Sequence, residues 1–344
     1  MSLPNLDQQM PALQEWLDLH LPTFGTIQNI DSVTGGYSNL TFRLHTTSGN
    51  YMLRMPPPGS AVKTAHDMGR EFRVLTALRP SYPLVPKVYK YCEDTAVLGA
   101  PFYIMEELQG IILRPGYDGL KNIFPEKFRH MSGQLINNLV ELHAIDIDAT
   151  GLAQLGKPEG YVHRQVKGWT ERYFQSATDE LRDMEMLAKW IGEQTPHAQH
   201  ATLLHNDYKY DNVLFDSNLT AITGVLDWEM ATIGDPLMDL GAALAYWFEA
   251  NDNKGFRSYN ITWLPGNLTR QECADLYAEK SGRDLSDLLF YYVFGLFKNA
   301  VIVQQIYYRW KKGLHTDNRF ETLLELVKLL SRHGIGTLEK NSIS

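Results

Sequence analysis

The sequence predicts an α+β fold, with strands in the first third of the chain and mainly helices in the rest. Five short strand-like runs, bounded by Gly, Pro and polar turn residues, precede residue 106 (27–33, 40–44, 51–55, 85–89 and 101–105). From Phe128 onward, apolar residues recur instead at helical spacing over long segments. A chain of 344 residues with 44% hydrophobic and 21% charged residues is globular and long enough for two lobes.

The overall charge and the cysteines narrow the class of protein. A formal net charge of −8 argues against nucleic acid as the main partner, because binding to a phosphate backbone requires clustered Lys and Arg. The N-terminus has no basic or apolar signal region, and no uninterrupted apolar stretch approaches the ~20 residues of a membrane-spanning helix. Cys92 and Cys273 are typical of buried thiols in a reducing compartment, with a disulfide as the alternative. We therefore expect a cytoplasmic protein without membrane or nucleic-acid partners; a homodimer stays open.

The strand-rich part also contains two helices and two notable connections. Residues 10–20 have the period of a short amphipathic helix, which Pro22 closes. The first two strands are joined by the glycine-containing loop 34–39, and residues 56–60 (PPPGS) predict a stiff connector. Residues 67–78 (DMGREFRVLTAL) predict a helix with one apolar face.

The second part is predicted to be helical. A helix starting near Phe128 ends at His143, and a second helix is expected over 170–191. Asp235 and Pro236 are typical of the N-cap and first turn of a further helix. Residues 288–310 form a long helical run rich in aromatic residues.

Between these helices, residues 203–229 carry the strongest chemical signal. Asp207 is followed five positions later by Asn212, and two short apolar runs flank a polar turn before Asp227. This pattern predicts a charged loop and a hairpin that brings Asn212 close to Asp227, with Asp207 one loop turn away. Phosphoryl transfer needs a carboxylate that takes the proton of the attacking hydroxyl, and hard oxygen ligands for Mg²⁺. The alternative is a set of ordinary polar loop residues.

The motifs of this segment carry a family resemblance. HNDYKYDN, LDWE and GDPLMDLG, all between residues 205 and 241, resemble the corresponding stretches of the aminoglycoside phosphotransferase and choline kinase-like family. The resemblance implies a bilobal, protein-kinase-like fold, with an antiparallel-sheet nucleotide-binding lobe at 1–108 and a mainly helical catalytic and acceptor-binding lobe at 109–344. It also implies transfer of the γ-phosphate of ATP, or GTP, to a small-molecule alcohol in the presence of Mg²⁺.

The resemblance assigns roles to individual residues. Asp207 becomes the catalytic base, and Asn212 and Asp227 become Mg²⁺ ligands. Asp239 and His205 are expected to brace the catalytic loop by hydrogen bonds. For the nucleotide, the resemblance implies four further contributions: the phosphate-covering loop with Ser38 and Asn39, the hinge backbone at Glu106 and Leu108, Arg54 on the phosphates, and Glu71 paired with Arg54.

Arg54 departs from the usual pattern, in which a lysine ends the third strand. Arginine keeps the charge, but its planar fork has a different reach from that of an ammonium group. A nucleotide-binding pseudokinase or regulatory module is therefore one rival to an active kinase. A protein kinase is a weaker rival, because GDPLMDLG follows Asp227 within a few residues and no A-P-E-like segment is found.

The acceptor is suggested by the aromatic run at 288–310 and the basic residues Arg309, Lys311 and Lys312. Together with YMLRMPPPG, this run resembles phosphotransferase-like proteins related to the kinase-like part of acyl-CoA dehydrogenase fusions. A hydroxyacyl-type metabolite with a negative group would suit such a pocket, formed with residues 150–200. The alternative is an aminoglycoside-modifying kinase, which would need a pocket lined with carboxylates.

Overall fold

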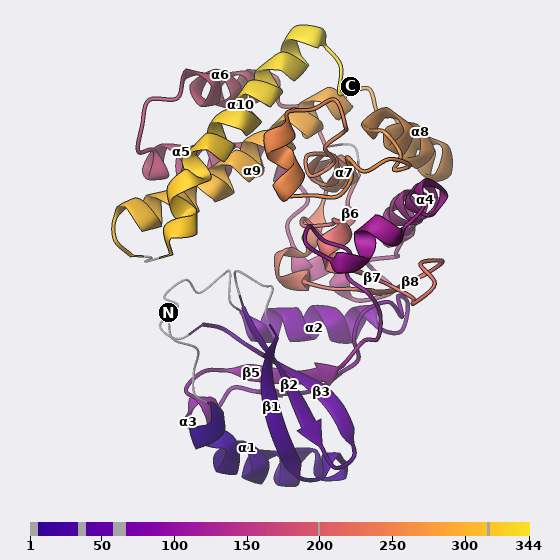
Figure 1. The fold of residues 1–344 in the computed structure, drawn as a ribbon, viewed down its shortest axis with the longest axis vertical. Coiled ribbons are helices and arrows are strands. Elements are labelled where there is room, and N and C mark those ends of the chain that lie inside the picture. The colour runs from indigo at the N-terminus through magenta and orange to yellow at the C-terminus, as the bar shows by residue number, and fades with distance from the viewer. Residues whose placement is uncertain (1–5, 34–38, 58–66, 199, 315–316) are drawn as a thin grey trace. The chain divides into compact units, whose positions relative to one another are not determined.

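The computed structural model describes residues 6–33, 39–57, 67–198, 200–314 and 317–344. The chain forms two compact units (Figure 1). Unit 1 contains Met1–Gly110 and also the segment Thr223–Ala231. Unit 2 contains Ile111–Ile222 and Thr232–Ser344.

Unit 1 is built on a five-stranded antiparallel sheet with the strand order β1-β2-β3-β5-β4. The strands are β1 Ile27–Val33, β2 Leu40–Thr46, β3 Gly49–Met55, β4 Val88–Cys92 and β5 Phe102–Glu106. Arg54 in β3 lies opposite Thr41 of β2 and Tyr103 of β5. Because side chains alternate between the faces of a strand, Arg54 and Tyr103 share a face, and their neighbours Leu53 and Phe102 share the other.

Helices cover the two faces of this sheet. Helix α1 (Leu6–His20) packs with the buried Leu13, Trp16 and Leu17 in one apolar cluster with Leu53 and Phe102. Helix α2 (Met68–Leu78) packs against β4 and β5 on the face that carries Arg54. The remaining helical turns of unit 1 are η1 Pro22–Phe24, α3 Thr95–Leu98 and η5 Trp228–Met230. The alternation of side chains along β3 therefore directs Arg54 toward α2.

Unit 2 is mainly helical. Its helices are α4 Pro125–His143, α5 Tyr161–Ser176, α6 Arg182–Glu193, α7 Pro236–Leu244, α8 Arg270–Ser281, α9 Leu288–Lys311 and α10 Leu323–Lys340, with 3₁₀ turns η2 Asp118–Asn122, η3 Leu152–Leu155, η4 Tyr210–Asn212, η6 Lys254–Ser258 and η7 Asn318–Thr322. Strands β6 (Thr202–Leu204) and β9 (Thr232–Gly234) pair antiparallel. β7 (Val213–Phe215) is followed by a turn and by β8 (Ile222–Val225), where the chain passes from unit 2 to unit 1. The expected fold class, an antiparallel-sheet part followed by a helical part, is confirmed.

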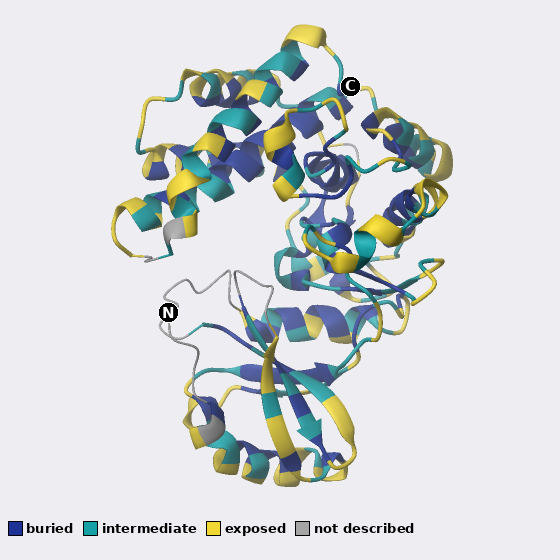
Figure 2. Ribbon diagram, viewed as in Figure 1, coloured by how far each residue is buried: buried dark blue, intermediate teal, exposed yellow. Residues whose placement is uncertain are grey.

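Helix α9 forms the centre of unit 2 (Figure 2). It packs against α5, α6, α7 and α10, and residues 290–301 are buried throughout. By length and composition, α9 is the one described helix that could cross a membrane, although the polar Lys298 and Asn299 interrupt its apolar run. However, 72% of its most apolar window is buried within the protein, as in the core helix of a folded domain.

Two of the differences between the predicted and observed element boundaries have a clear physical cause. The helix expected over 170–191 is two helices, because the chain is extended at Ala177. Gln304 of α9 donates hydrogen bonds to the Ser176 carbonyl (2.8 Å) and to Thr178 Oγ1 (3.0 Å), which fix this break. The strand expected at 85–89 begins only at Val88, after Pro86. Tertiary contacts and proline thus override the local period.

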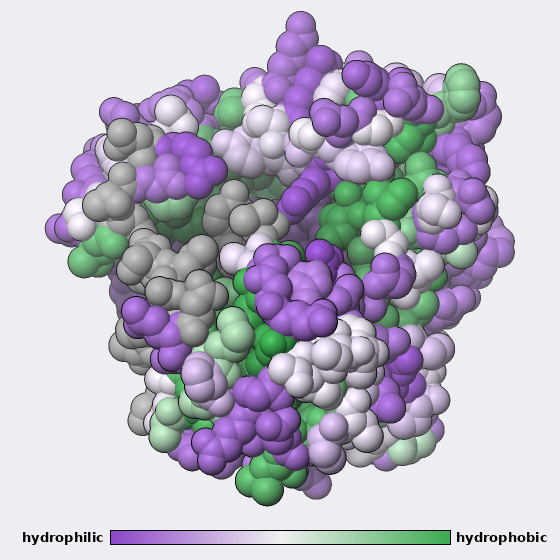
Figure 3. Space-filling model, turned by 60° about the horizontal axis from the view of Figure 1, so that its bottom comes forward, coloured by the Kyte–Doolittle hydropathy of each residue, from purple (hydrophilic) through white to green (hydrophobic). Residues whose placement is uncertain are grey.

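The surface is mixed in character. Figure 3 shows one face, on which hydrophilic and hydrophobic residues are interspersed. Large exposed apolar side chains are scattered along the sequence, for example Leu19, Phe124 and Leu314. Cys92 and Cys273 are both free and buried.

Candidate active site

The loop between β6 and β7, residues 205–212, is hydrogen-bonded through its backbone to the side chain of Asp239. The Asp239 carboxylate accepts hydrogen bonds from the backbone N–H groups of His205 (2.6 Å) and Asn206 (2.8 Å). β6 pairs with β9, and β9 leads directly into α7, where Asp235 caps the helix by accepting from the N–H of Leu237. The GDPLMDLG segment therefore places the Asp239 carboxylate against the backbone at the start of the loop.

Asp239 is itself part of a buried hydrogen-bond chain. His143 Nε2 lies 3.2 Å from Asp239, and His143 Nδ1 lies 2.7 Å from the hydroxyl of Tyr277. An ionised Asp239 can only accept, so His143 donates from Nε2; as a neutral imidazole it then accepts at Nδ1 from the Tyr277 hydroxyl, which also accepts from Arg283 (3.4 Å). Burial lowers the pKa of His143. Burial alone would raise the pKa of Asp239, but the hydrogen bonds from His143 and the His205 backbone hold it below its usual value.

The Asp207 carboxylate is anchored by two side chains of its own loop. Lys209 Nζ lies 2.9 and 2.8 Å from its two oxygens, and Asn212 Nδ2 donates to Oδ2 at 2.8 Å and to the Asp207 carbonyl at 2.7 Å. The side chain of Asp207 is 17% exposed. Burial would raise the pKa of Asp207, but Lys209, with smaller contributions from His205 and Lys298, holds it below its usual value. The carboxylate is thus ionised, fixed in direction and still accessible.

Lys209 is a site residue that the sequence analysis missed. Its ammonium bridges both oxygens of Asp207 and lies 4.6 Å from the ring centroid of Tyr246. Its position two residues after Asp207, inside the same short motif, is the signal that could have revealed it. A cation beside the carboxylate is a group that could also contact a phosphate.

A second cluster of predicted residues lies within unit 1, around Arg54. Its Nε donates to Glu71 Oε2 (3.0 Å), and its Nη2 lies 2.5 Å from Asp227 Oδ1 and 3.3 Å from Glu229 Oε2. Glu229 also accepts a hydrogen bond from Asn39 Nδ2 (2.6 Å). Glu71 is 3% exposed, and its burial raises its pKa against the opposing effect of Arg54. One guanidinium therefore joins the strand, α2 and the segment after β8.

The segment that carries Asp227 is fixed by its neighbours. The indole N–H of Trp228 donates to the Val225 carbonyl (2.9 Å), and Arg70 of α2 donates to the Glu229 carbonyl (3.2 Å). Asp227 has φ +69° and Asn206 has φ +66°, in the left-handed region that favours glycine. Backbone strain of this kind in non-glycine residues is typical of functional sites.

The remaining predicted nucleotide contacts are partly described. Ser38 lies outside the described residues, whereas Asn39 is buried. Glu106, at the end of β5, accepts a hydrogen bond from the Lys87 N–H (2.9 Å) and pairs with Arg79 (3.2 Å). Leu108 is half-buried in the segment that follows β5.

The donor types at the predicted metal ligands fit Mg²⁺. Asn212 uses Nδ2 for Asp207, so its amide oxygen faces elsewhere and can serve a cation. Asp227 offers a carboxylate, one oxygen of which contacts Arg54. Amide and carboxylate oxygens are the ligands that Mg²⁺ prefers. Among the described residues, no cluster of three His, Cys, Asp or Glu side chains could hold a metal ion.

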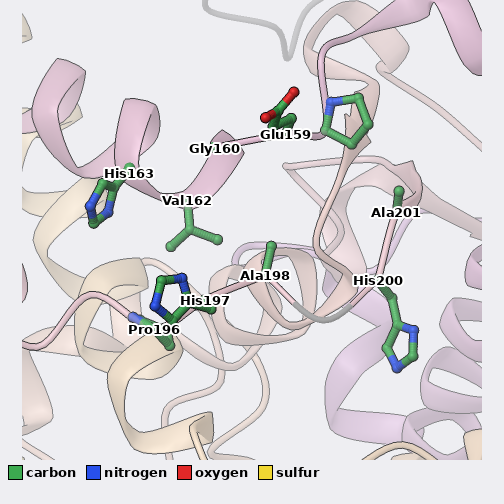
Figure 4. Close-up of a pocket in the computed structure, with 10 residues that line it drawn as sticks. Glu159, Gly160, Val162, His163, Pro196, His197, Ala198, His200 and Ala201 are labelled. Carbon is green, nitrogen blue, oxygen red and sulfur yellow. The ribbon is translucent and has the colours of Figure 1, made fainter.

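A separate surface pocket lies in unit 2, between the start of α5 and the segment before β6. It has a volume of about 450 Å³ and is lined by Glu159, His163, His197 and His200, among others (Figure 4). Its histidines are exposed, and none of the predicted site residues lines it. This pocket is therefore distinct from the cluster around Asp207 in unit 2 and from the cluster around Arg54 in unit 1.

Comparison with known proteins shows the family of the chain. Residues 29–276 match the model of the phosphotransferase enzyme family. The chain is 32% identical over 354 residues to acyl-CoA dehydrogenase family member 11 of Rattus norvegicus, covering 98% of this chain and 45% of that protein. The chain thus spans less than half of the length of this relative.

Solved structures support the same assignment. A candidate aminoglycoside phosphotransferase from Ralstonia eutropha JMP134 has a TM-score of 0.81 at 29% identity, covering 96% of this chain and 98% of that one. The GDP and kanamycin complex of APH(2″)-IIIa has a TM-score of 0.64 at 18% identity, covering 94% and 98%, which bears on the fold alone. The predicted family resemblance and kinase-like fold are confirmed, and the family match indicates an enzyme that transfers phosphoryl groups. The chain belongs to the phosphotransferase enzyme family.

Proposed function

We propose that this protein transfers the γ-phosphate of ATP, or GTP, to a hydroxyl group of a small molecule. The observation that carries the proposal is the Asp207 carboxylate, which is ionised, 17% exposed and held by Lys209 and Asn212. Family membership makes phosphoryl transfer the chemistry for which such a carboxylate is needed.

In the proposed reaction, Asp207 accepts the proton of the acceptor hydroxyl while the acceptor oxygen bonds to the γ-phosphorus. The bond from that phosphorus to the β–γ bridging oxygen breaks, and the nucleoside diphosphate leaves. Lys209 offsets the negative charge that gathers near Asp207. We assign Asn212 and Asp227 as Mg²⁺ ligands; the bound ion would neutralise phosphate charge.

For the nucleotide, we propose that residues 1–108 form the binding part and that 109–344 carry the catalytic loop and the acceptor site. Arg54 would contact the phosphates and Glu71 would hold Arg54 in place, which their 3.0 Å contact supports. Ser38 and Asn39 would cover the phosphates, and the backbone at Glu106 and Leu108 would meet the base. GDP in a structural neighbour of 18% identity keeps GTP open as donor.

For the acceptor, we propose a hydroxyacyl-type metabolite with a negative group. Most aromatic side chains of α9 are core residues, so the helix offers a ligand mainly its C-terminal end, where Tyr308 and Trp310 are half-buried. Arg309, Lys311 and Lys312 are exposed there, and Lys311 pairs with Asp179 (3.0 Å) before α6. The similarity to acyl-CoA dehydrogenase family member 11 supports an acyl-type acceptor.

The test is to measure nucleotide turnover with Mg²⁺ across hydroxyacyl compounds, aminoglycosides, choline and homoserine, with each donor nucleotide. We expect turnover that depends on a hydroxyacyl compound. Robust phosphorylation of an aminoglycoside alone would refute the acceptor and favour an antibiotic-modifying kinase. If no compound in the panel is phosphorylated and the protein binds no nucleotide, the proposed kinase function is refuted.

One contact favours a second candidate, a nucleotide-binding pseudokinase or regulatory module. Arg54 Nη2 lies 2.5 Å from the carboxylate that should bind Mg²⁺, so a retained ion pair would compete with the metal. Calorimetric titration with ATP in the presence and absence of Mg²⁺ separates the two candidates. Tight binding that is indifferent to Mg²⁺, without turnover, would support the pseudokinase.

A further inference from the structure

Helix α9 contains one buried lysine in an otherwise largely apolar and aromatic stretch. Lys298 is 5% exposed, and residues 290–301 around it are all buried. Placing an ammonium group in such an interior is costly unless specific partners compensate for the lost water. The helix therefore accommodates this charge for a reason other than packing.

The contacts of Lys298 lead to the catalytic loop. Its Nζ donates a hydrogen bond to the carbonyl of Asn206 at 2.8 Å, and the ring of Trp169 from α5 lies 5.8 Å away. Within the described part of the chain, Lys298 has no carboxylate within 4.0 Å, the limit of a direct ion pair. Burial lowers the pKa of Lys298, while the more distant Asp207 and Asp239 favour its charged form.

Asn206, the residue that Lys298 contacts, has a strained backbone conformation. Asn206 has φ +66°, is buried, and directly precedes Asp207. Its N–H is held by Asp239 at 2.8 Å, and its carbonyl by Lys298 at 2.8 Å. Side chains of opposite charge, from α7 and α9, thus hold the two ends of one left-handed residue, whose conformation sets the direction in which the chain presents Asp207.

We propose that Lys298 is a positioning residue of the phosphoryl transfer, which fixes the peptide before Asp207 so that the Asp207 carboxylate meets the acceptor hydroxyl. This inference rests on the function proposed above. Lys298 does not take or give the proton itself; its ammonium holds the Asn206 carbonyl from the core while Asp239 holds the amide. Loss of either contact lets Asn206 relax toward an ordinary backbone conformation.

The test compares Lys298→Met, which keeps the shape but removes the charge and the donor, with Lys298→Arg, which keeps both. Lys328→Met, on the neighbouring helix α10 and far from the loop in its contacts, is the matched control. We expect Lys298→Met to lower kcat by about 10²-fold with little change in the KM for nucleotide, because misplacement of a reacting group acts on the chemical step. Lys298→Arg should restore part of that loss, and Lys328→Met should behave as wild type.

A second measurement keeps the inference independent of turnover. Hydrogen exchange followed by mass spectrometry, without nucleotide, reports on the amides of residues 203–212. Lys298→Met should speed exchange there while residues 125–143 of α4 keep their protection. An unchanged loop, or equally faster exchange throughout unit 2, would overturn the positioning role, whichever way the turnover assay falls. Absence of turnover in the wild type would refute the proposed function alone, since the loop measurement needs no substrate. If Lys298→Arg does not fold, the Met variant and the exchange data still decide.

Discussion

Nη2 of Arg54 lies 2.5 Å from Oδ1 of Asp227, although 173 positions separate the two residues in the sequence. The same guanidinium contacts Glu71 and Glu229, so three carboxylates surround one cation. The guanidinium makes these contacts through two nitrogens, Nε and Nη2, whereas a lysine would have a single nitrogen for all three carboxylates. The arginine in place of the usual lysine thus joins the residues assigned to phosphate and to metal.

Arg54→Ala should destabilise the protein and weaken nucleotide binding, because it leaves the buried Glu71 without its partner. Breaking a buried pair in this way costs about 3 kcal/mol, to be measured by urea unfolding. Arg54→Lys should retain binding, with equal or higher turnover. Arg43→Ala, which removes the half-exposed pair with Glu107 on the same sheet, is the control and should cost less than about 1 kcal/mol. Equal effects of the two alanine variants would contradict a special role of Arg54.

Asp227→Ala should abolish the Mg²⁺ dependence of nucleotide binding while sparing the folded state. Glu229→Ala is the matched control, since Glu229 contacts the same Nη2 but is not an assigned metal ligand. Titration of ATP with and without Mg²⁺ checks the difference. If Asp227→Ala keeps the metal dependence of the wild type, Asp227 has a structural role.

The sequence predicts most features that depend on a periodic pattern or on residues close together in the chain. The strand-rich first part and the helical remainder follow from apolar period, and the sheet and helices agree with it. The five-residue spacing of Asp207 and Asn212 predicts two side chains in one loop, and a 2.8 Å hydrogen bond joins them. Their chemical roles remain predictions. The distance between Arg54 and Glu71, 17 positions, likewise predicts a pair that the structure contains.

Contacts between distant segments could not be predicted in the same way. The contact of Lys298 with the catalytic loop could not be predicted, because its partner Asn206 lies 92 positions earlier. The break between α5 and α6 depends on Gln304, which no local period reveals. Lys209 lies only two residues after Asp207, yet a lysine in a loop does not stand out until its contact with Asp207 is known. In each case, the sequence alone does not identify the residue that the polar side chain contacts in the folded protein.

Asp207→Asn should keep the fold and the nucleotide affinity and lose turnover, because the amide is nearly isosteric but cannot take a proton. Loss of a general base typically costs about 10² to 10⁴ in rate. The control is Asp216→Asn in the turn after β7, whose carboxylate accepts hydrogen bonds from Thr220 and from the N–H of Ala221. Single-turnover assays of the three proteins make the comparison. Near wild-type turnover of Asp207→Asn would exclude Asp207 as the base.

The buried pair of His143 and Asp239 should make stability fall on acidification. Both groups have pKa values in the folded protein below their usual values, His143 through burial and Asp239 because hydrogen bonds outweigh burial. A depressed folded-state pKa means that the unfolded chain binds the proton first. The contribution of His143 is therefore complete above about pH 6.5 and declines as the pH falls toward its folded-state value. That of Asp239 declines only below about pH 4.

His143→Gln isolates the histidine, because the amide can donate to Asp239 and accept from Tyr277 without titrating. Unfolding free energies of wild type and variant are measured between pH 7.5 and 5.5. The wild type should lose up to about 1.4 kcal/mol more than His143→Gln by pH 5.5, one unit below the unfolded-state pKa of histidine. Parallel pH profiles would mean that His143 titrates alike in both states, and a steeper profile for the variant would reverse the sign. Either result would remove the neutral imidazole from the support of Asp239, and with it one of the contacts that hold the catalytic loop.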